Sequence, residues 1–188
     1  MEGSRVGELE HQVAELRDEV ARLTAEVREL SLTDELTGAS SRRGFLVRAE
    51  QARLLVRRRK EQSVLLVVGV DGLNGVDDGL GHDHGDDLRR EAAMVLSNAF
   101  RECDVVGRWD GDDFVTFLGG AINADPARRR LEERVDRSNL HRTGRALRIS
   151  IGAATVTAAD TRPLTEILSE AFAALHAEQL ARGVPSTR

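Results

Sequence analysis

The feature that most constrains the fold is a predicted β-hairpin with an acidic tip. Two apolar-rich runs, Asp104–Trp109 and Phe114–Leu118, lie on either side of the pair Asp110-Gly111. An Asp-Gly pair between apolar strands is a strong signal for a tight turn. Further acidic residues follow the pair directly, and an arginine precedes the first strand. The sequence therefore predicts a hairpin with several carboxylate side chains at its turn.

Helical and strand-like patterns alternate on both sides of this hairpin, which predicts an α/β fold. Apolar residues recur at helical spacing in the segments 41–60, 85–100, 126–138 and 164–181. Buried-strand patterns occupy Ser63–Val70 and Leu147–Val156. In the second helix we expect four side chains to point inward, namely Leu88, Ala92, Met94 and Val95. We also expect Cys103 to be a small buried residue of the first hairpin strand.

The first 32 residues form a separate element with a heptad pattern. Valine and leucine alternate at spacings of three and four with no Gly or Pro from residue 8 onward, at positions Val6, Leu9, Val13, Leu16, Val20, Leu23, Val27 and Leu30. A β-branched residue at a with Leu at d favours a parallel two-stranded coiled coil. The alternative is a single amphipathic helix that packs against the domain of its own chain, but such a helix normally has a wider apolar stripe than the a and d positions alone. We therefore predict a dimeric coiled coil over 1–32 and a globular domain over 33–188.

Composition limits the classes of protein and of partner. The chain has 188 residues, of which 40% are hydrophobic, enough for one globular domain with an extension. Its net charge of -5 argues against nucleic acid as the main partner. The longest apolar run, Val64–Val68, is far too short to cross a bilayer, which argues against a membrane partner. A single cysteine and a start without a signal-peptide pattern predict a cytoplasmic protein.

Four ordered blocks of sequence share motifs with one known family. Leu32–Phe45 is similar to D-x-L-T-G-L-x-N-R-R-x-F, with Ser41 in place of the Asn. Gly69–Asp86 follows the spacing of D-x-D-x-F-K-x-x-N-D-x-x-G-H-x-x-G-D. The hairpin tip Asp110–Phe114 is similar to G-G-D-E-F, and Ser150-Ile-Gly-Ala is similar to S-I-G-x-A. Together with Ala174-Leu-His, which is similar to A-L-Y, these blocks resemble the GGDEF domain of bacterial diguanylate cyclases over residues 32–183.

This resemblance implies a particular architecture for the globular part. The GGDEF domain resembles the palm of nucleotidyl cyclases, so we expect an α/β domain with a central mixed sheet flanked by helices. The coiled-coil helix would precede it. In this family each subunit of a dimer binds one GTP, and two molecules of GTP are joined into cyclic di-GMP.

The same resemblance implies a depleted catalytic site. In the family, an Asp on the first strand and an acid in the hairpin hold two metal ions on the GTP phosphates. The strand acid corresponds to Gly69, which has no side chain, while Asp112 corresponds to the hairpin acid and Val70 offers only a backbone carbonyl. Asp113 stands where the signature has Glu, so Asp112 and Asp113 are vestigial catalytic positions. One carboxylate in place of two weakens metal binding, so Mg²⁺ is expected only if a nucleotide binds this vestigial site.

Phosphate and base contacts are also reduced. The three cations that neutralise the triphosphate in the family correspond to Asn74, Gln179 and Gly183. The two residues that bind the guanine edge correspond to Asp77 and Asp86, and an ionised Asp77 lacks the amide donor of an Asn. Taken without the resemblance, these acids equally fit a solvated loop and a helix N-terminus.

A second site of the family keeps its residues. Arg101 and Asp104 match the R-x-x-D element that binds cyclic di-GMP as an inhibitor, five residues before the hairpin signature. Arginine makes bidentate, geometrically selective contacts with guanine and phosphate. Arg130 and Arg134, from the charged helix, are candidates for a further contact. The alternative is an ordinary surface pair, because R-x-x-D alone is a weak motif.

The expected function follows from the contrast between the two sites. A cyclic di-GMP effector built on an inactive GGDEF domain, which passes the signal to an unknown protein partner, fits best. A weakly or fully active diguanylate cyclase is the second reading. A dimeric scaffold that binds no nucleotide is the third.

Overall fold

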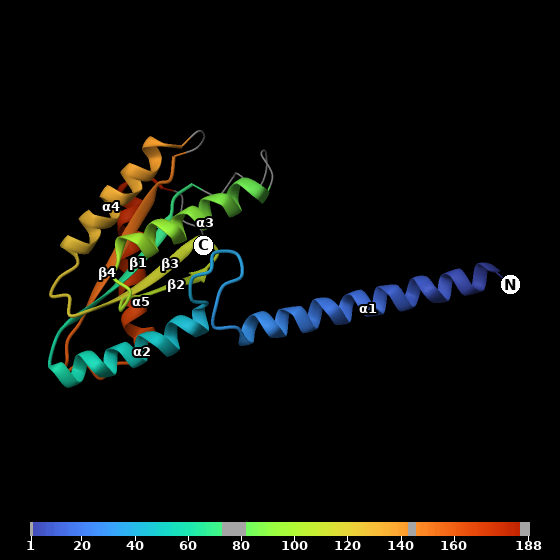
Figure 1. Cartoon of the computed structure of the whole chain (residues 1–188), viewed down its shortest axis with the longest axis horizontal. Coiled ribbons are helices and arrows are strands. Elements are labelled where there is room, and N and C mark those ends of the chain that lie inside the picture. Colours follow the sequence, from blue (N-terminus) through green and yellow to red (C-terminus); the bar gives the residue numbers. More distant parts are fainter. Residues whose placement is uncertain (1, 73–81, 143–145, 185–188) are drawn as a thin grey trace. The chain divides into compact units, whose positions relative to one another are not determined.

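The computed structural model describes residues 2–72, 82–142 and 146–184 (Figure 1). The chain divides into two compact units, Met1–Ser31 and Leu32–Arg188. The first unit consists of helix α1 (Glu2–Leu30). The second contains a four-stranded sheet and the remaining helices.

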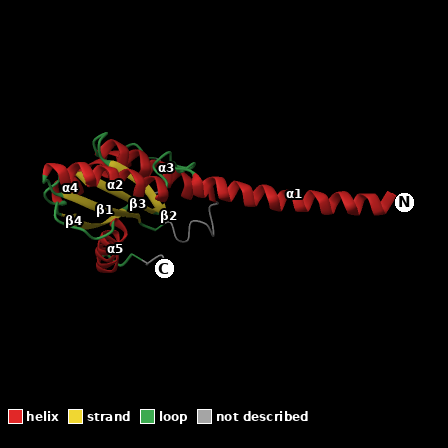
Figure 2. Cartoon of the chain, turned by 90° about the horizontal axis from the view of Figure 1, so that it is seen from below, coloured by secondary structure: helices red, strands yellow, loops and turns green. Residues whose placement is uncertain are grey.

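The elements of the second unit follow the predicted alternation of helices and strands closely. Their bounds are α2 (Arg42–Arg59), β1 (Ser63–Val70), α3 (His82–Ala99), β2 (Val105–Asp110), β3 (Asp113–Gly119), α4 (Asp125–Leu140), β4 (Ile149–Val156) and α5 (Leu164–Ala181). Figure 2 shows the strands in yellow with helices packed against them. The predicted α/β class, a sheet flanked by helices, is confirmed.

The order of strands in the sheet is β2-β3-β1-β4, and all neighbours pair antiparallel. The prediction of a mixed sheet was therefore wrong for these four strands. Two βαβ units, β1-α3-β2 and β3-α4-β4, interleave as in ferredoxin-like folds. Because β3 returns from the hairpin into the space between β1 and β2, the two parallel strands of each unit are never neighbours.

The central strand β1 contributes side chains to two separate cores. Val64, Leu66 and Val68 pack with α3 and α4 on one face of the sheet. Leu65 and Val67 pack with α2 and α5 on the other face. Successive strand residues point to opposite faces, so a strand covered on both sides must be apolar at every position. This explains the unbroken apolar run in the sequence.

Gly152 sets the distance between β4 and α5. A Cβ atom at this position would lie 2.0 Å from the Ala171 carbonyl oxygen and 2.4 Å from the Leu175 nitrogen. Those are backbone atoms of α5, which cannot move aside as a side chain can. The glycine of the S-I-G-x-A motif thus permits the close packing of the last helix.

Both outer strands of the sheet have backbone groups bound by other parts of the domain. On β4, the Ile151 amide donates to Glu178 Oε1 at 3.2 Å, and the Ile151 carbonyl accepts from Arg128 Nη2 at 2.6 Å. On β2, the amide of Arg108 donates to the carbonyl oxygen of Ser40 at 2.8 Å. The segment before α2 and the side chains of α4 and α5 therefore lie along these edges.

The hairpin turn lies one residue later than predicted. Asp110 still belongs to β2 and is paired with Asp113, so the two turn residues are Gly111 and Asp112. A register shift between Arg108 and Asp110 inserts an extra residue into β2, which moves the turn along the chain. Gly111 has φ of +48°, a left-handed conformation that favours glycine.

Two predicted burials were wrong. Met94 is 57% exposed, because Leu88, Ala92 and Val95 form the inward face of α3 and Met94 lies two residues beyond Ala92, on the other side of the helix. Cys103 is exposed, because β2 begins only at Val105 and the cysteine lies in the turn before it.

Helix α1 has an uncovered apolar stripe. The a and d side chains that the structure describes are between 45% and 65% exposed, and they are Val13, Leu16, Val20, Leu23, Val27 and Leu30. Nothing within its own unit covers this stripe. Among the described residues, no helix combines the length and the apolarity that crossing a membrane requires.

Candidate functional site

The end of β1 meets the hairpin turn, as the family resemblance implies. Gly69 is paired with Asp113 in the register of β1 and β3. The Val70 amide donates to the Asp112 carbonyl oxygen at 3.1 Å. The two residues predicted for metal binding, Val70 and Asp112, therefore lie beside Gly69, the position of the missing strand acid, at one edge of the sheet.

The space beside Gly69 holds a glutamine side chain. A Cβ atom on Gly69 would lie 2.9 Å from Gln179 Nε2 and 3.3 Å from Asp113 Oδ1. Gln179 is only 5% exposed. It stands where the resemblance implies a phosphate-binding lysine, so the end of β1 has a neutral amide beside it in place of a cation and lacks the strand carboxylate.

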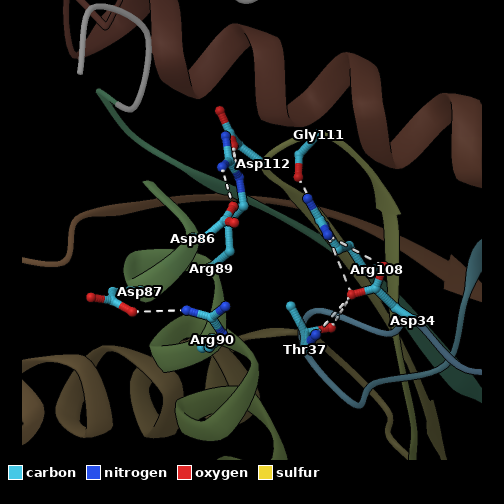
Figure 3. Close-up of polar contacts among 9 residues, drawn as sticks. All are labelled: Asp34, Thr37, Asp86, Asp87, Arg89, Arg90, Arg108, Gly111 and Asp112. Atoms are coloured by element: carbon cyan, nitrogen blue, oxygen red, sulfur yellow. Dashed lines mark hydrogen bonds and ion pairs between the residues drawn. The ribbon is translucent and has the colours of Figure 1, made fainter. Parts of the chain in front are cut away.

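Asp112 is bound by an arginine of α3 (Figure 3). Arg89 Nε donates to Asp112 Oδ1 at 2.8 Å, and Arg89 Nη1 donates to Asp86 Oδ1 at 2.9 Å. One guanidinium thus joins the predicted hairpin acid to a predicted guanine-binding acid. Figure 3 also shows the neighbouring pair of Arg90 with Asp87, which does not reach the hairpin.

These contacts lie largely out of solvent. The side chains of Arg89 and Asp112 are 17% and 13% exposed. Burial by itself lowers the pKa of Arg89, but hydrogen bonds and opposite charge from Asp112, and then from Asp86, outweigh it and raise that pKa above its ordinary value. The guanidinium is therefore held in its charged form between the two acids.

The residues present do not fit a divalent metal ion. Gly69 supplies no ligand, and one oxygen of Asp112 already accepts a hydrogen bond from Arg89. Among the residues whose positions are described, no group of three or more His, Cys, Asp or Glu side chains has an arrangement that could hold a metal. Mg²⁺ prefers several oxygen ligands in octahedral geometry, and the described side chains around Asp112 do not offer them.

The predicted base contacts are only partly visible. Asp77 and Asn74 lie outside the described residues. Asp86 lies on α3, and its side chain is 38% exposed and paired with Arg89. The structure therefore brings Asp86 to the hairpin through Arg89.

A buried carboxyl group follows β1 and contacts the last helix. Asp71, 6% exposed, accepts from Ser150 Oγ at 2.9 Å and lies 3.9 Å from Arg182 Nη1. Burial raises the pKa of Asp71, while the Ser150 hydrogen bond and the Arg182 charge act against this rise. Arg182 also donates to the Ile149 carbonyl at 2.6 Å, and Gly183 follows it with a positive φ. Arg182, the cation that directly follows α5 in the chain, thus contacts the sheet.

Arg101 and Asp104 form a closed turn between α3 and β2. The Asp104 amide donates to the Arg101 carbonyl, and Asp104 Oδ2 accepts from the Arg101 amide, both at 2.9 Å. The Asp104 carboxylate therefore fixes the backbone of the turn. The Arg101 side chain is exposed and makes no hydrogen bond or ion pair with any described residue.

These two residues line a cavity of about 300 Å³ together with Arg130 of α4. The cavity is also lined by Phe100, Leu118, Gly119, Gly120, Ala121, Ile122, Asn123, Pro126 and Ala127. Arg134, the other candidate on α4, is exposed and is not among the lining residues. The structure thus brings Arg130 to the R-x-x-D element and leaves Arg134 away from it.

A second cavity of about 770 Å³ adjoins the first and shares Arg101 with it. Its other side is formed by the end of α2, including Arg59 and Lys60, and it contains Cys103. Arg101 therefore shares one cavity with Arg130 and the other with Arg59, Lys60 and the acidic Glu61.

Arg89 was absent from the sequence-based site. The spacing of three residues between Asp86 and Arg89 allows a pair between neighbouring helical turns. The contact with Asp112, 23 residues further on, had no local signal. It depends on the packing of α3 against the hairpin end of the sheet.

Comparison with known proteins agrees with this geometry. Residues 31–183 match the GGDEF domain of diguanylate cyclases. The chain is 31% identical over 128 residues to the probable diguanylate cyclase DgcC of Escherichia coli, covering 66% of this chain and 34% of that protein, so it spans about a third of that relative.

Two solved structures have the same fold. Diguanylate cyclase SiaD of Pseudomonas aeruginosa, in complex with its activator SiaC, is 27% identical with a TM-score of 0.70, over 94% of this chain and 69% of that one. The coiled coil and GGDEF domain of DgcB from Caulobacter crescentus, in complex with c-di-GMP, is 23% identical with a TM-score of 0.71, over 92% of this chain and 95% of that one. With the motifs and the matching sheet, these similarities show that the chain belongs to the GGDEF domain family.

Proposed function

We propose that this protein is a cyclic di-GMP effector whose GGDEF domain no longer catalyses nucleotide cyclisation. Cyclic di-GMP would bind at Arg101 and Asp104 and change how the protein engages a downstream protein partner. The effector would act in the cytoplasm as a homodimer.

One observation carries the proposal. Arg101 and Asp104, from the turn before β2, and Arg130, from α4, line one cavity, and the Arg101 guanidinium has no partner among the described residues. An unpaired arginine at a cavity is suited to bidentate contact with the phosphates or guanine edges of a dinucleotide. Arg59 and Lys60 in the adjoining cavity add positive charge near the same ligand.

The residues around Asp112 support the absence of catalysis. Joining two nucleoside triphosphates requires charge neutralisation at the phosphates. Here Gly69 offers no carboxylate, Gln179 offers no charge, and Asp112 is paired with Arg89. These deficits are the same whichever divalent ion is supplied.

The relatives support both the ligand and the existence of a protein partner. DgcB has been captured with c-di-GMP, and SiaD has been captured with its activator SiaC. These facts belong to those proteins. They make the same class of ligand, and regulation by a bound protein, reasonable for this chain.

A functioning cyclase is the second candidate. Val70 and Asp112 still meet at the end of β1, as catalysis in this family requires, and the relative DgcC is named a probable diguanylate cyclase. A scaffold that binds no nucleotide is the third. It is favoured if every nucleotide titration is silent.

We further propose that α1 forms a parallel coiled coil with a second copy of the chain. Its described a and d side chains are at least 45% exposed in the single chain, and a contiguous exposed apolar stripe of this kind marks a site of association. The self-complementary pattern of Val at a and Leu at d makes another α1 helix the best occupant.

Isothermal titration calorimetry with two ligands tests the proposed function. Cyclic di-GMP is expected to bind with a saturable heat, and GTP with Mg²⁺ is expected to give a much weaker response. Saturable GTP binding accompanied by product formation would favour the cyclase. Silence with both ligands, in protein shown by circular dichroism to be folded, would favour the scaffold.

A further inference from the structure

We propose that Arg89 supplies, from within the chain, the positive charge that a divalent ion would bring to Asp112, and that it thereby excludes metal from the hairpin turn. This inference rests on the part of the proposed function that makes the domain catalytically inactive. It adds a specific cause besides the missing strand carboxylate. It does not depend on whether Arg101 binds cyclic di-GMP.

The geometry favours a stable internal contact over a passing surface pair. Different nitrogens of the Arg89 guanidinium donate to two separate carboxylates, at 2.8 Å to Asp112 and 2.9 Å to Asp86. Hydrogen bonds between ionised partners are stronger than neutral ones. The arginine also connects α3 to the turn between β2 and β3, so its position is fixed from two sides (Figure 3).

Burial strengthens this argument. With side-chain exposures of 17% and 13%, Arg89 and Asp112 are screened by solvent much less than a surface pair. Removing one partner of such a pair leaves a poorly solvated charge, which is strongly unfavourable. A divalent ion approaching Asp112 would have to displace a guanidinium that is already in place, and would meet its positive charge.

The adjacent residue provides a matched comparison. Arg90 donates to Asp87 at 2.9 Å, the same spacing of three residues along α3 that separates Arg89 from Asp86. The side chains of Arg90 and Asp87 are 53% and 68% exposed, and their pair does not include the hairpin. Arg90 therefore has the same chemistry on the same helix without access to Asp112.

The experiment first supplies the missing ligand. Gly69→Asp introduces a carboxylate beside the turn, where the nearest atom is the end of the Gln179 side chain, which can rotate away. Mn²⁺ binding, followed by electron paramagnetic resonance without any nucleotide, is then compared in Gly69→Asp and in the same variant carrying Arg89→Leu or Arg90→Leu.

We expect Mn²⁺ affinity at least tenfold higher in Gly69→Asp/Arg89→Leu than in either other protein. Equal affinity in Gly69→Asp and Gly69→Asp/Arg89→Leu, including no binding by both, would overturn the proposal. The same holds if Arg90→Leu tightens binding as much as Arg89→Leu does. Since no nucleotide is present, failure here leaves the cyclic di-GMP proposal untouched.

A second measurement applies if the double variant does not fold. Thermal unfolding of Asp112→Asn, Arg89→Leu and the two combined forms a double-mutant cycle in the otherwise unaltered chain. We expect Arg89→Leu to lower the Tm less in the Asp112→Asn background than in the wild type, because Asp112→Asn has already removed the negative charge that Arg89 pairs with. Additive decreases in Tm would show that Arg89 and Asp112 are not coupled, and the proposal would fail.

Discussion

The Arg108 guanidinium lies 3.3 Å from each carboxylate oxygen of Asp34, a residue 74 positions away in the sequence. The same arginine donates from Nε to the Gly111 carbonyl at 3.0 Å (Figure 3). Asp34 in turn accepts from the Thr37 amide and hydroxyl at 3.0 and 2.6 Å. One ion pair thus connects the segment that precedes α2 to the tip of the hairpin.

Asp34→Ala should lower the free energy of unfolding by about 1–3 kcal/mol, because Arg108 is only 17% exposed and loses its carboxylate partner. Urea denaturation monitored by circular dichroism measures this change. Glu133→Ala is the control, since Glu133 and Arg137 are both 67% exposed and their pair should contribute less than about 1 kcal/mol. Equal losses in the two variants would contradict a structural role for the Asp34 contact.

Arg101→Ala should weaken cyclic di-GMP binding roughly ten- to a hundredfold, since it removes a charge-assisted contact that contributes about 1.5–3 kcal/mol. Calorimetric titration measures the affinity. Arg130→Ala should also weaken binding, whereas Arg134→Ala should not, because only Arg130 lines the cavity. The effector hypothesis fails if wild type and Arg101→Ala bind equally, or if neither binds at about 100 μM ligand.

Asp104 is best tested with a conservative substitution. Asp104 Oδ2 accepts from the Arg101 amide, so Asp104→Ala would disturb the turn as well as the ligand contact. Asp104→Asn keeps an acceptor and removes the charge. We expect it to weaken binding while the circular dichroism spectrum stays unchanged, and unaltered affinity would show that the carboxylate charge does not contact the ligand.

The purified protein should form little or no cyclic di-GMP from GTP with Mg²⁺ or Mn²⁺. The reason is the combined absence of a carboxylate at Gly69 and of a cation at Gln179. Gly69→Asp alone should not restore full turnover, since Gln179 still offers no charge to phosphate. Chromatography of the reaction mixture measures the cyclic di-GMP that is formed. Robust turnover by the unaltered protein would overturn the proposal that the domain is catalytically inactive.

Removal of residues 1–31 should convert a dimer into a folded monomer. The remaining unit, Leu32–Arg188, contains both faces of the sheet and their covering helices, so its cores are complete without α1. Light scattering measures the mass of the truncated protein in solution, and circular dichroism shows whether it is folded. A dimer that persists after truncation would mean that surfaces of the globular unit drive association.

Asp160 should contribute to the pH dependence of stability. Hydrogen bonds from Arg162 lower the pKa of Asp160 from 3.8 to about 2. The unfolded chain therefore binds the proton more readily, so this contribution is present above pH 3.8 and is lost as the pH falls toward about 2. Denaturation at several pH values should show that the free energy of unfolding of Asp160→Asn falls less steeply with decreasing pH than that of the wild type. The same pH dependence in both proteins between pH 3.8 and about 2 would contradict this prediction.

Much of the fold was predictable because it depends on local patterns. The range of β1 and that of α5 follow from the apolar run and from helical periodicity, and the structure has them over the same residues. Met94 was placed wrongly because a helix of small and apolar residues admits more than one inward face. The antiparallel sheet was missed because pairing depends on where the hairpin returns, which no single strand encodes.

The candidate site also has a part that the sequence indicates and a part that depends on tertiary packing. Arg101 and Asp104 are candidates because of the family motif and its distance along the chain from the hairpin, and in the structure Arg130 lines a cavity with them while Arg134 does not. The Arg89 contact could not be found, because it depends on the angle at which α3 crosses the end of the sheet. The turn at Gly111-Asp112 was displaced by an irregularity in strand register, which depends on pairing geometry and has no compositional signal.

The bound edges of the sheet restrict how copies of this domain can associate. Exposed strand edges invite strand addition and amyloid-like growth. At β4 the Ile151 amide and carbonyl are already taken by Glu178 and Arg128, and at β2 the backbone is engaged by Ser40. A second copy therefore finds these ladder positions filled, which disfavours the addition of a strand at them and leaves side-chain surfaces as the better sites of association.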